Sequence, residues 1–268
     1  MVNDGFRLDD RVCLVTGGAG ILGEPMCRAL LAHGARVGVV DRDAARVAEV
    51  VERLGVDGAA SRVRGFTADI TTRAAVETVV SSVENELGEI AVLVNNAAAK
   101  SPNFFAPFEE FPIEDWDLVM RVNLTAAMLC CQVVGGAMAR RGRGSIVNTL
   151  SVYGIVAPDQ RIYEGSSYEG RAINTPAIYS ASKAGLWGLT KYLASYWGGK
   201  GVRVNALTPG GVFSGQNDTF VQRYAARVPL ARMAKREELT GALVYLASDA
   251  SSYVTGHNLV VDGGLTAW

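Results

Sequence analysis

Short apolar runs alternate with longer stretches of helical periodicity along the whole chain. The apolar runs predict strands at residues 11–16, 35–40, 62–67, 90–94, 144–150, 202–207 and 258–261. The helical spacing predicts helices at residues 21–33, 44–54, 72–87, 116–140, 177–198 and 236–247. The first run is apolar on both faces, as a buried parallel strand is. Because strands and helices alternate with short connections, we predict an α/β fold with a doubly wound parallel sheet of about seven strands and helices on both faces.

Composition narrows the classes of partner. Of 268 residues, 49% are hydrophobic and 20% are charged, as in an ordinary globular protein. The net charge of −1 argues against a nucleic acid or an anionic membrane surface as the main partner. Two His and four Cys residues leave little material for a metal site. Because the cysteines form no C-x-x-C pair, we expect reduced core residues at Cys13, Cys27, Cys130 and Cys131.

The organisation of the chain is simple. No linker rich in Pro, Ser or Gly divides it and no internal repeat is evident, so we expect one domain over residues 1–268. Residues 1–10 are polar and acidic and lack the basic and apolar regions of a signal peptide. No apolar run approaches the roughly 20 residues of a membrane span. These observations favour a cytoplasmic protein.

Residues 18–23 read G-x-G-x-x-G, directly after the first expected strand and at the start of the first expected helix. Glycine lets the backbone turn tightly and approach a pyrophosphate closely. The free N–H groups and partial positive charge of the helix N-terminus then face that anion. A plain strand-to-helix turn is the alternative, but the context is the one that a dinucleotide-binding motif requires.

Two residues after the second strand bear on the choice of coenzyme. Asp41 ends that strand, where a carboxylate accepts hydrogen bonds from ribose hydroxyls and repels the 2′-phosphate of NADP. Arg42 is a signal in the other direction, because a basic side chain there could hold the phosphate. We favour NAD as the cofactor and leave NADP open.

Polar residues also follow the third and fourth strands. Asp69 could accept a hydrogen bond from an adenine amino group, or it could be an acid at a helix N-terminus just before Thr71. Residues 95–98 read Asn-Asn-Ala-Ala after the fourth strand. Short polar side chains at the carboxyl end of such a strand point into the ligand crevice, and a turn stabilised by the asparagines is compatible with that role.

Tyr179 and Lys183 are four residues apart in an expected helix and share one face of it. A free tyrosine has a pKa near 10 and is a poor acid–base catalyst at neutral pH. A nearby ammonium stabilises the phenolate and lowers that pKa. Taken alone, the pair could equally be a Tyr/Lys pair on a solvated helix face.

A larger ordered set of motifs changes that balance. Its members are Thr16–Gly17 with Gly23, Asp69, Asn95–Asn96–Ala97, Asn123, Ser151, Tyr179-x-x-x-Lys183, Pro209–Gly210 and Asp262–Gly263–Gly264. In order and spacing this set resembles the short-chain dehydrogenase/reductase family in its single-domain form, over essentially the whole chain. The resemblance implies a single-domain Rossmann fold.

The resemblance also implies residue roles. Tyr179 would be the general acid/base, and Lys183 would lower its pKa and bind the nicotinamide ribose. Ser151 would hydrogen-bond the substrate oxygen, Asn123 would hold a water in a proton relay, and backbone groups after Pro209 would contact the nicotinamide amide. The implied cofactor-binding set is Gly17, Gly20, Ile21, Leu22, Gly23, Asp41, Arg42, Asp69, Ile70, Asn96, Ala97, Ala98, Tyr179, Lys183, Pro209, Gly210 and Val212.

The chain departs from the family pattern in three places. Ile21 stands at the usual middle glycine, so the glycines are spaced as in larger two-domain relatives. Ala98 replaces the glycine of the N-N-A-G motif. The interval from Ser151 to Tyr179 is much longer than in most relatives. The insertion, at about 157–175, carries Asp159, Gln160, Arg161, Tyr163, Tyr168 and Arg171. That mixture suits a hydroxyl-rich substrate, although a subunit contact or a solvent-facing excursion is an alternative.

These features predict an NAD-dependent dehydrogenase that acts on a secondary alcohol or its ketone. We favour a sugar, polyol or nucleotide-sugar substrate, because Ser214, Gln216 and Asn217 add polar groups near the expected substrate loop. An NADPH-dependent 3-oxoacyl reductase is one alternative, against which Asp41 speaks. A nucleotide-binding regulator without catalysis is another, against which the intact set of catalytic residues speaks.

Two long expected helices bear on assembly. Residues 126–130 are five consecutive apolar residues, so helix 116–140 is apolar nearly all round and must be covered on its outer side. In the family this helix and 177–198 pair across a two-fold axis, and the stretches 252–256 and 259–261 form a second contact. Two different two-folds generate a tetramer, so we expect a homotetramer. Burial within one subunit is the alternative.

Overall fold

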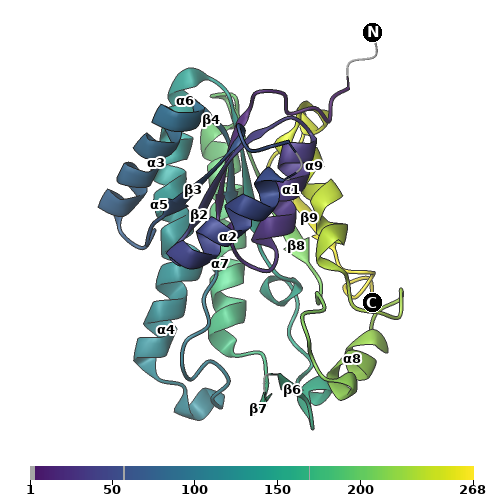
Figure 1. The fold of residues 1–268 in the computed structure, drawn as a ribbon. Coiled ribbons are helices and arrows are strands. Elements are labelled where there is room, and N and C mark those ends of the chain that lie inside the picture. The colour runs from purple at the N-terminus through teal and green to yellow at the C-terminus, as the bar shows by residue number, and fades with distance from the viewer. Residues whose placement is uncertain (1–3, 57, 169) are drawn as a thin grey trace.

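A central parallel sheet lies between two layers of helices in the computed structural model, which describes residues 4–56, 58–168 and 170–268 (Figure 1). The sheet has seven strands in the order β3-β2-β1-β4-β5-β8-β9. The strands are β1 Val12–Thr16, β2 Arg36–Asp41, β3 Val63–Thr67, β4 Ile90–Asn95, β5 Gly144–Thr149, β8 Val202–Pro209 and β9 Asn258–Val261. All six pairings are parallel, and the chain changes direction across the sheet between β1 and β4. The predicted doubly wound sheet is confirmed.

The helices divide into two layers by the side chains they bury. The helices are α1 Gly23–Ala32, α2 Ala44–Gly55, α3 Arg73–Leu87, α4 Ile113–Met120, α5 Ala126–Cys130, α6 Gly136–Arg141, α7 Ala177–Gly198, α8 Asp218–Ala225 and α9 Thr240–Ala247. Apolar side chains of α1, α2 and α9 form one core with one face of the sheet. Those of α3, α5, α6 and α7 form another with the opposite face. The two cores leave the carboxyl ends of the strands free to carry a site.

Local capping explains where two of the helices begin. The Asp43 carboxylate accepts hydrogen bonds from two backbone N–H groups of the first turn of α2. The Thr72 hydroxyl accepts one from the first turn of α3. Predicted and observed boundaries therefore agree closely here. The predicted helix 236–247 is instead a 3₁₀ turn, Arg236–Leu239, followed by α9.

The long helix is not uniform. It runs continuously over Ile113–Arg141, and π-helical turns at Arg121–Thr125 and Cys131–Gly135 separate α4, α5 and α6. In the described part of the chain it is the one helix long and apolar enough, by length and composition, to cross a membrane. Our expectation that no stretch approaches that length is wrong for this helix. Its side chains Ala126, Cys130 and Val134 are buried against the sheet, so it is a core helix.

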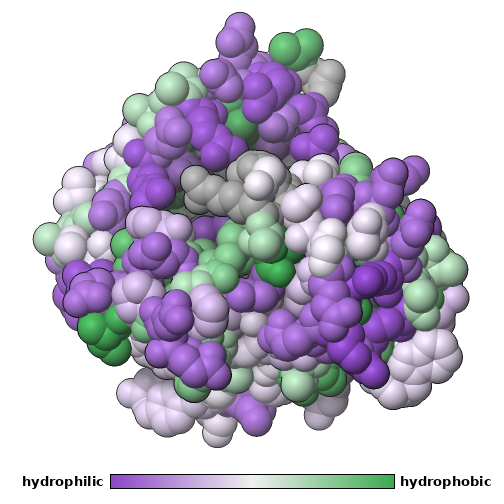
Figure 2. Space-filling view, turned by 90° about the horizontal axis from the view of Figure 1, so that it is seen from below, coloured by the Kyte–Doolittle hydropathy of each residue, from purple (hydrophilic) through white to green (hydrophobic). Residues whose placement is uncertain are grey.

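Irregular segments gather at one end of the molecule (Figure 1). The insertion contains a 3₁₀ turn at Gln160–Tyr163 and a two-stranded antiparallel ribbon of β6 Ser167–Tyr168 and β7 Arg171–Ala172. Buried residues of this region pack with α8 in a separate core. The side chains of Tyr168 and Arg171 lie outside the described part. Seen from this end, the surface is hollowed, with apolar groups inside the hollow and hydrophilic groups around it (Figure 2).

Candidate active site

The glycine loop joins β1 to α1 in an unusually close turn. Gly17 has φ +62°, a conformation that favours glycine. A Cβ on Gly23 would lie 2.1 Å from the Gly17 carbonyl oxygen, and a Cβ on Gly18 would lie 3.0 Å from the Val15 carbonyl oxygen. The loop backbone is therefore packed against the start of α1 with no room for side chains. A helix N-terminus approached this closely by bare backbone fits a pyrophosphate.

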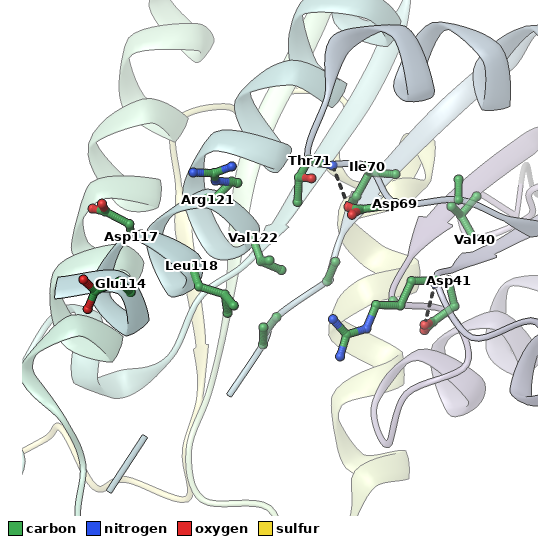
Figure 3. Close-up of a pocket in the computed structure, with 16 residues that line it drawn as sticks. Val40, Asp41, Asp69, Ile70, Thr71, Glu114, Asp117, Leu118, Arg121 and Val122 are labelled. Atoms are coloured by element: carbon green, nitrogen blue, oxygen red, sulfur yellow. Dashed lines mark hydrogen bonds between the residues drawn. The ribbon is translucent and has the colours of Figure 1, made fainter. Parts of the chain in front are cut away.

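A cavity of about 530 Å³ opens beside this loop at the ends of β2 and β3. Asp41 and Asp69 line it from the sheet side, and Glu114, Asp117, Leu118, Arg121 and Val122 line it from the long helix, with Leu118 and Val122 directed toward the sheet side (Figure 3). The predicted cofactor residues on its wall are Gly17, Asp41, Arg42, Asp69, Ile70, Ala97 and Ala98. Its size and its acidic strand ends fit the adenosine half of a nicotinamide dinucleotide.

The carboxylates of Asp41 and Asp69 also accept hydrogen bonds from nearby backbone N–H groups. Asp41 Oδ1 accepts a hydrogen bond from the Arg42 N–H at 2.8 Å, and Asp69 Oδ1 accepts one from the Thr71 N–H at 3.1 Å (Figure 3). These bonds fix the direction of each side chain at the cavity wall. Asp69 is thus the expected turn acid and also lines the cavity, while its hydrogen bond to an adenine amino group stays a prediction.

Asn96 connects the loop after β1 to the loop after β4, at the point where the strand order reverses. Its Nδ2 donates to the carbonyl oxygens of Thr16 and Gly17 at 3.3 and 3.1 Å. The Thr16 hydroxyl in turn accepts hydrogen bonds from the N–H groups of Asn96 and Ala97. The end of β1 and the end of β4 are thereby held in one geometry, which keeps the glycine loop in place.

A second cavity, of about 430 Å³, shares Ala98 and Ala99 with the first. It contains the predicted catalytic residues Ser151, Tyr179 and Lys183. The predicted cofactor residues on its wall are Ile21, Leu22, Asn96, Ala98, Tyr179, Lys183, Pro209, Gly210 and Val212. The two adjoining cavities offer a continuous site for a dinucleotide, with its nicotinamide end next to the catalytic residues.

Tyr179 and Lys183 lie one turn apart on α7, and Ser151 directly follows the carboxyl end of β5. Burial raises the pKa of the Tyr179 phenol above its ordinary value, and a hydrogen bond with the Ser151 hydroxyl acts in the opposite direction. The Ser151 hydroxyl also accepts a hydrogen bond from the Tyr153 N–H at 3.2 Å. Two hydroxyls that line the same cavity can hold one substrate oxygen between them and move its proton.

The ammonium of Lys183 is buried and donates to the Thr149 carbonyl oxygen at 2.7 Å. Burial lowers the pKa of Lys183 to about 8. Burial is the largest influence on the pKa of Tyr179, and Lys183 is not among the groups that shift it in this geometry. The expected lowering by Lys183 therefore stays a prediction.

Asn123 lies in the first π-helical turn and is 1% exposed. Its Oδ1 accepts a hydrogen bond from the Ala99 N–H at 2.9 Å, and its Nδ2 donates to the Ser182 hydroxyl at 3.2 Å. Asn123 thus ties the loop after β4 to helix α7. Like Gly20 and Gly23, it shapes the backbone around the cavities and is not part of their described walls. Its predicted relay role stays a prediction.

Sequence reasoning missed several residues of the second cavity. Tyr153, Thr175 and Tyr224 line it together with Tyr163 of the insertion. The Tyr224 hydroxyl accepts a hydrogen bond from the Gly211 N–H and so supports the loop after β8. The only available signal was the polar and aromatic composition of the insertion. The contacts themselves join segments far apart in the sequence.

The three polar residues expected near the substrate lie in different places. Ser214 and Gln216 line the second cavity, and Gln216 Oε1 accepts a hydrogen bond from the Ser214 N–H at 2.8 Å. Asn217 instead caps α8, since its side chain accepts a hydrogen bond from the Phe220 N–H. Asn217 is not among the residues described on the cavity wall, so its expected place near the substrate stays a prediction.

A doubly wound sheet with a glycine loop at its switch point, beside a buried Ser–Tyr pair and a lysine, defines a nicotinamide-dependent oxidoreductase with a Rossmann fold. Residues 18–266 match the family model described as "Enoyl-(Acyl carrier protein) reductase". The chain belongs to the short-chain dehydrogenase/reductase family and is an NAD(P)-dependent oxidoreductase that acts on alcohol groups.

Known proteins of this family resemble the chain along nearly its whole length. D-threitol dehydrogenase of Mycolicibacterium smegmatis is 37% identical over 269 residues, which cover 97% of this chain and 95% of that protein. The structure of a gluconate 5-dehydrogenase from Burkholderia cenocepacia with NADP and tartrate has a TM-score of 0.86 at 32% identity, covering 99% of this chain and 98% of that one. A short-chain dehydrogenase from Leptospira borgpetersenii with bound NAD+ has a TM-score of 0.85 at 34% identity, covering 99% and 96%.

Proposed function

We propose that this enzyme oxidises a secondary hydroxyl of a polyol or sugar derivative with NAD as the preferred acceptor. The observation that carries the proposal is that Ser151, Tyr179 and Lys183 line one cavity, which adjoins the coenzyme cavity. Relatives whose names specify a polyol or a sugar acid support the substrate class. The single domain would span residues 1–268, with the insertion covering the substrate end.

The proposed chemistry divides between the coenzyme and the chain. When bound, the nicotinamide supplies the hydride acceptor. Ser151 and Tyr179 would hold the reacting hydroxyl, and the Tyr179 oxygen would take its proton in oxidation or return it in reduction. Lys183 is held by the Thr149 carbonyl, where its charge would favour the phenolate and its N–H groups would bind the ribose. Asn123 would position the proton path through its bonds to Ala99 and Ser182.

Asp41 supports the preference for NAD over NADP. Its carboxylate lines the adenosine cavity at the end of β2, where it would accept hydrogen bonds from ribose hydroxyls. A 2′-phosphate would meet that negative charge, and Arg42 on the same wall would offset the repulsion only in part. An NADPH-dependent 3-oxoacyl reductase stays the second candidate, since a 3-oxoacyl-[acyl-carrier-protein] reductase of Thermotoga maritima is 34% identical over 97% of this chain.

We further propose a cytoplasmic homotetramer. Tyr192 and Tyr196 on α7 are 63% and 57% exposed, and Ile113 on α4 is 63% exposed. These side chains would be covered if the long helices paired with those of a second subunit. Tyr253 is fully exposed and would belong to a second contact. The described cysteines are free and buried, which supports a reducing compartment.

The test is a coenzyme and substrate panel read by NADH or NADPH absorbance. Wild type and Tyr179→Phe are assayed on D-threitol, D-arabinitol, galactitol, gluconate and a 3-oxoacyl thioester. We expect NAD-dependent oxidation of at least one polyol by wild type. The Phe variant should lose turnover and keep NADH binding, because only the proton carrier is removed. Reduction of the thioester alone would establish the second candidate, and substantial activity of the Phe variant would refute the role of Tyr179.

A further inference from the structure

Three hydroxyl groups form a chain in the catalytic cavity, separate from the Ser–Tyr–Lys set. The Tyr163 hydroxyl donates to the Tyr153 hydroxyl at 3.3 Å and shares a short hydrogen bond with the Thr175 hydroxyl. All three residues line the 430 Å³ cavity that also contains Ser151 and Tyr179. The function proposed above assigns no task to this chain of hydroxyls.

Counting donors and acceptors shows which hydrogen bonds these three hydroxyls can still make. Each hydroxyl has one O–H donor and two lone pairs. When Tyr163 donates to Tyr153 and accepts from Thr175, the proton of Tyr153 and one lone pair of Tyr163 are uncommitted among the described residues. A donor and an acceptor therefore lie about one hydrogen bond apart. A hydroxyl group satisfies both, whereas a methyl group satisfies neither.

The insertion places this pair next to the reacting centre. Tyr163 lies in the 3₁₀ turn Gln160–Tyr163, and its ring stacks on Phe220 of α8 with ring centres 5.5 Å apart. Tyr163 and Tyr179 line the same cavity. Tyr153 follows Ser151 by two residues and its N–H donates to the Ser151 hydroxyl. Both tyrosines are thus fixed relative to the pair that would hold the reacting oxygen.

The rest of this wall is largely apolar. Its apolar members include Ile21, Leu22, Phe104, Leu150, Val152, Pro176, Val212, Phe220 and Met233, and its other polar members include Asn174, Ser214 and Gln216. A substrate hydroxyl buried among such side chains loses its bonds to water, so it needs a polar partner in the cavity. The tyrosine pair is such a partner, close to the Ser151–Tyr179 pair.

We propose that Tyr153 and Tyr163 together bind a second hydroxyl of the substrate, on the carbon next to the one that is oxidised. The inference rests on the proposed dehydrogenase function and specifies its substrate class as vicinal diols. Tyr153 donates to the second hydroxyl and Tyr163 accepts from it. Thr175 is a positioning residue that fixes the proton of Tyr163 toward Tyr153.

The test compares 2,3-butanediol with 2-butanol, which differ by one vicinal hydroxyl. We expect wild type to prefer the diol in kcat/KM by about 10-fold or more, as expected for a site that hydrogen-bonds a substrate hydroxyl. Tyr163→Phe and Tyr153→Phe should each reduce this preference several-fold, and the double variant should bring it near one. Each Phe keeps the aromatic ring, and in Tyr163→Phe the stacking on Phe220 is retained. The affinity for NADH should stay at the wild-type level, and rates on 2-butanol should fall less than rates on the diol.

Matched variants separate recognition from general damage. Tyr245→Phe removes a partly buried phenol outside the cavity and should leave the preference unchanged. Thr175→Val should give a smaller loss than either tyrosine variant. A wild-type enzyme that oxidises both alcohols without preference, or a double variant that retains the preference, would overturn the inference while the proposed dehydrogenase function stands. Failure of wild type on both alcohols and on the polyol panel would overturn both.

Discussion

Replacing Gly23 by alanine tests whether the close packing of the glycine loop serves coenzyme binding. The added Cβ would lie 2.1 Å from the Gly17 carbonyl oxygen and 2.7 Å from two backbone atoms of Gly18. Real Cβ contacts essentially never fall below 3.0 Å, and all three neighbours are backbone. The variant can therefore fold only if the loop moves away from the start of α1.

Gly23→Ala should lower both the stability of the fold and the affinity for NADH. Overpacking of a tight site costs about 1–3 kcal/mol of stability. A displacement on the order of 1 Å from productive geometry costs about 100-fold in a positioned interaction. We therefore expect Gly23→Ala to weaken NADH binding by about 10- to 100-fold and to lower the free energy of unfolding by about 1–3 kcal/mol.

Gly20→Ala is the matched control in the same loop. Its Cβ would have a single close neighbour, the Gly17 carbonyl oxygen at 3.1 Å, so a small adjustment accommodates it. NADH fluorescence titration gives the affinities, and urea unfolding gives the stabilities of both variants. Circular dichroism confirms that each is folded during the titration. Wild-type affinity in a folded Gly23→Ala, or equal losses in both variants, would refute the argument from the 2.1 Å contact.

Three further predictions concern coenzyme choice, a buried charge and assembly. Asp41→Ala should weaken NAD binding by about 10-fold and reduce discrimination against NADP; tighter NADPH than NADH binding by wild type would give Arg42 the decisive role. Lys183→Met should stabilise the fold at pH 7 by about 1–3 kcal/mol, since wild type there keeps a costly buried ammonium. The pKa of Lys183 is about 8 in the folded protein, against an ordinary value of 10.5, so wild type gains stability as the pH rises through that window. The difference in unfolding free energy between Lys183→Met and wild type, measured by urea unfolding, should therefore shrink with rising pH. A difference that stays constant with pH would contradict this prediction. Light scattering should give four times 28.4 kDa, and a monomer would refute the helix pairing.

The sheet could be predicted because its signals are local. Each strand is an apolar run bounded by polar or glycine residues, and short connections fix the alternation with helices. Helix α8 could not be predicted in this way. Only half of its eight residues are hydrophobic, and its two buried residues, Phe220 and Tyr224, pack with Val152 and Ile162 of distant segments. Such burial exists only once those segments have been brought together.

The candidate site could also be predicted only in part, and again only where its signals are local in the sequence. The four-residue spacing of Tyr179 and Lys183 predicted a shared helix face, and both line one cavity. The direction of the Lys183 ammonium depends on the Thr149 carbonyl, which is 34 residues away in sequence. The Tyr153–Tyr163 contact likewise depends on how the insertion folds back, which no periodicity encodes. Chemistry-bearing residue types were therefore visible in the sequence, whereas their partners were not.

The π-helical turn at Arg121–Thr125 makes the number of residues in the long helix as important as their identity. Its last bond runs from the Ala126 N–H to the Arg121 carbonyl, one residue farther than in an α-helix. The extra residue rotates everything after it by about 100° relative to α4. Acidic residues of α4 can thus face the coenzyme cavity while α5 turns its small side chains into the core. Deleting one residue here would restore a regular helix and set these two faces against each other, so the helix can vary in composition far more freely than in length.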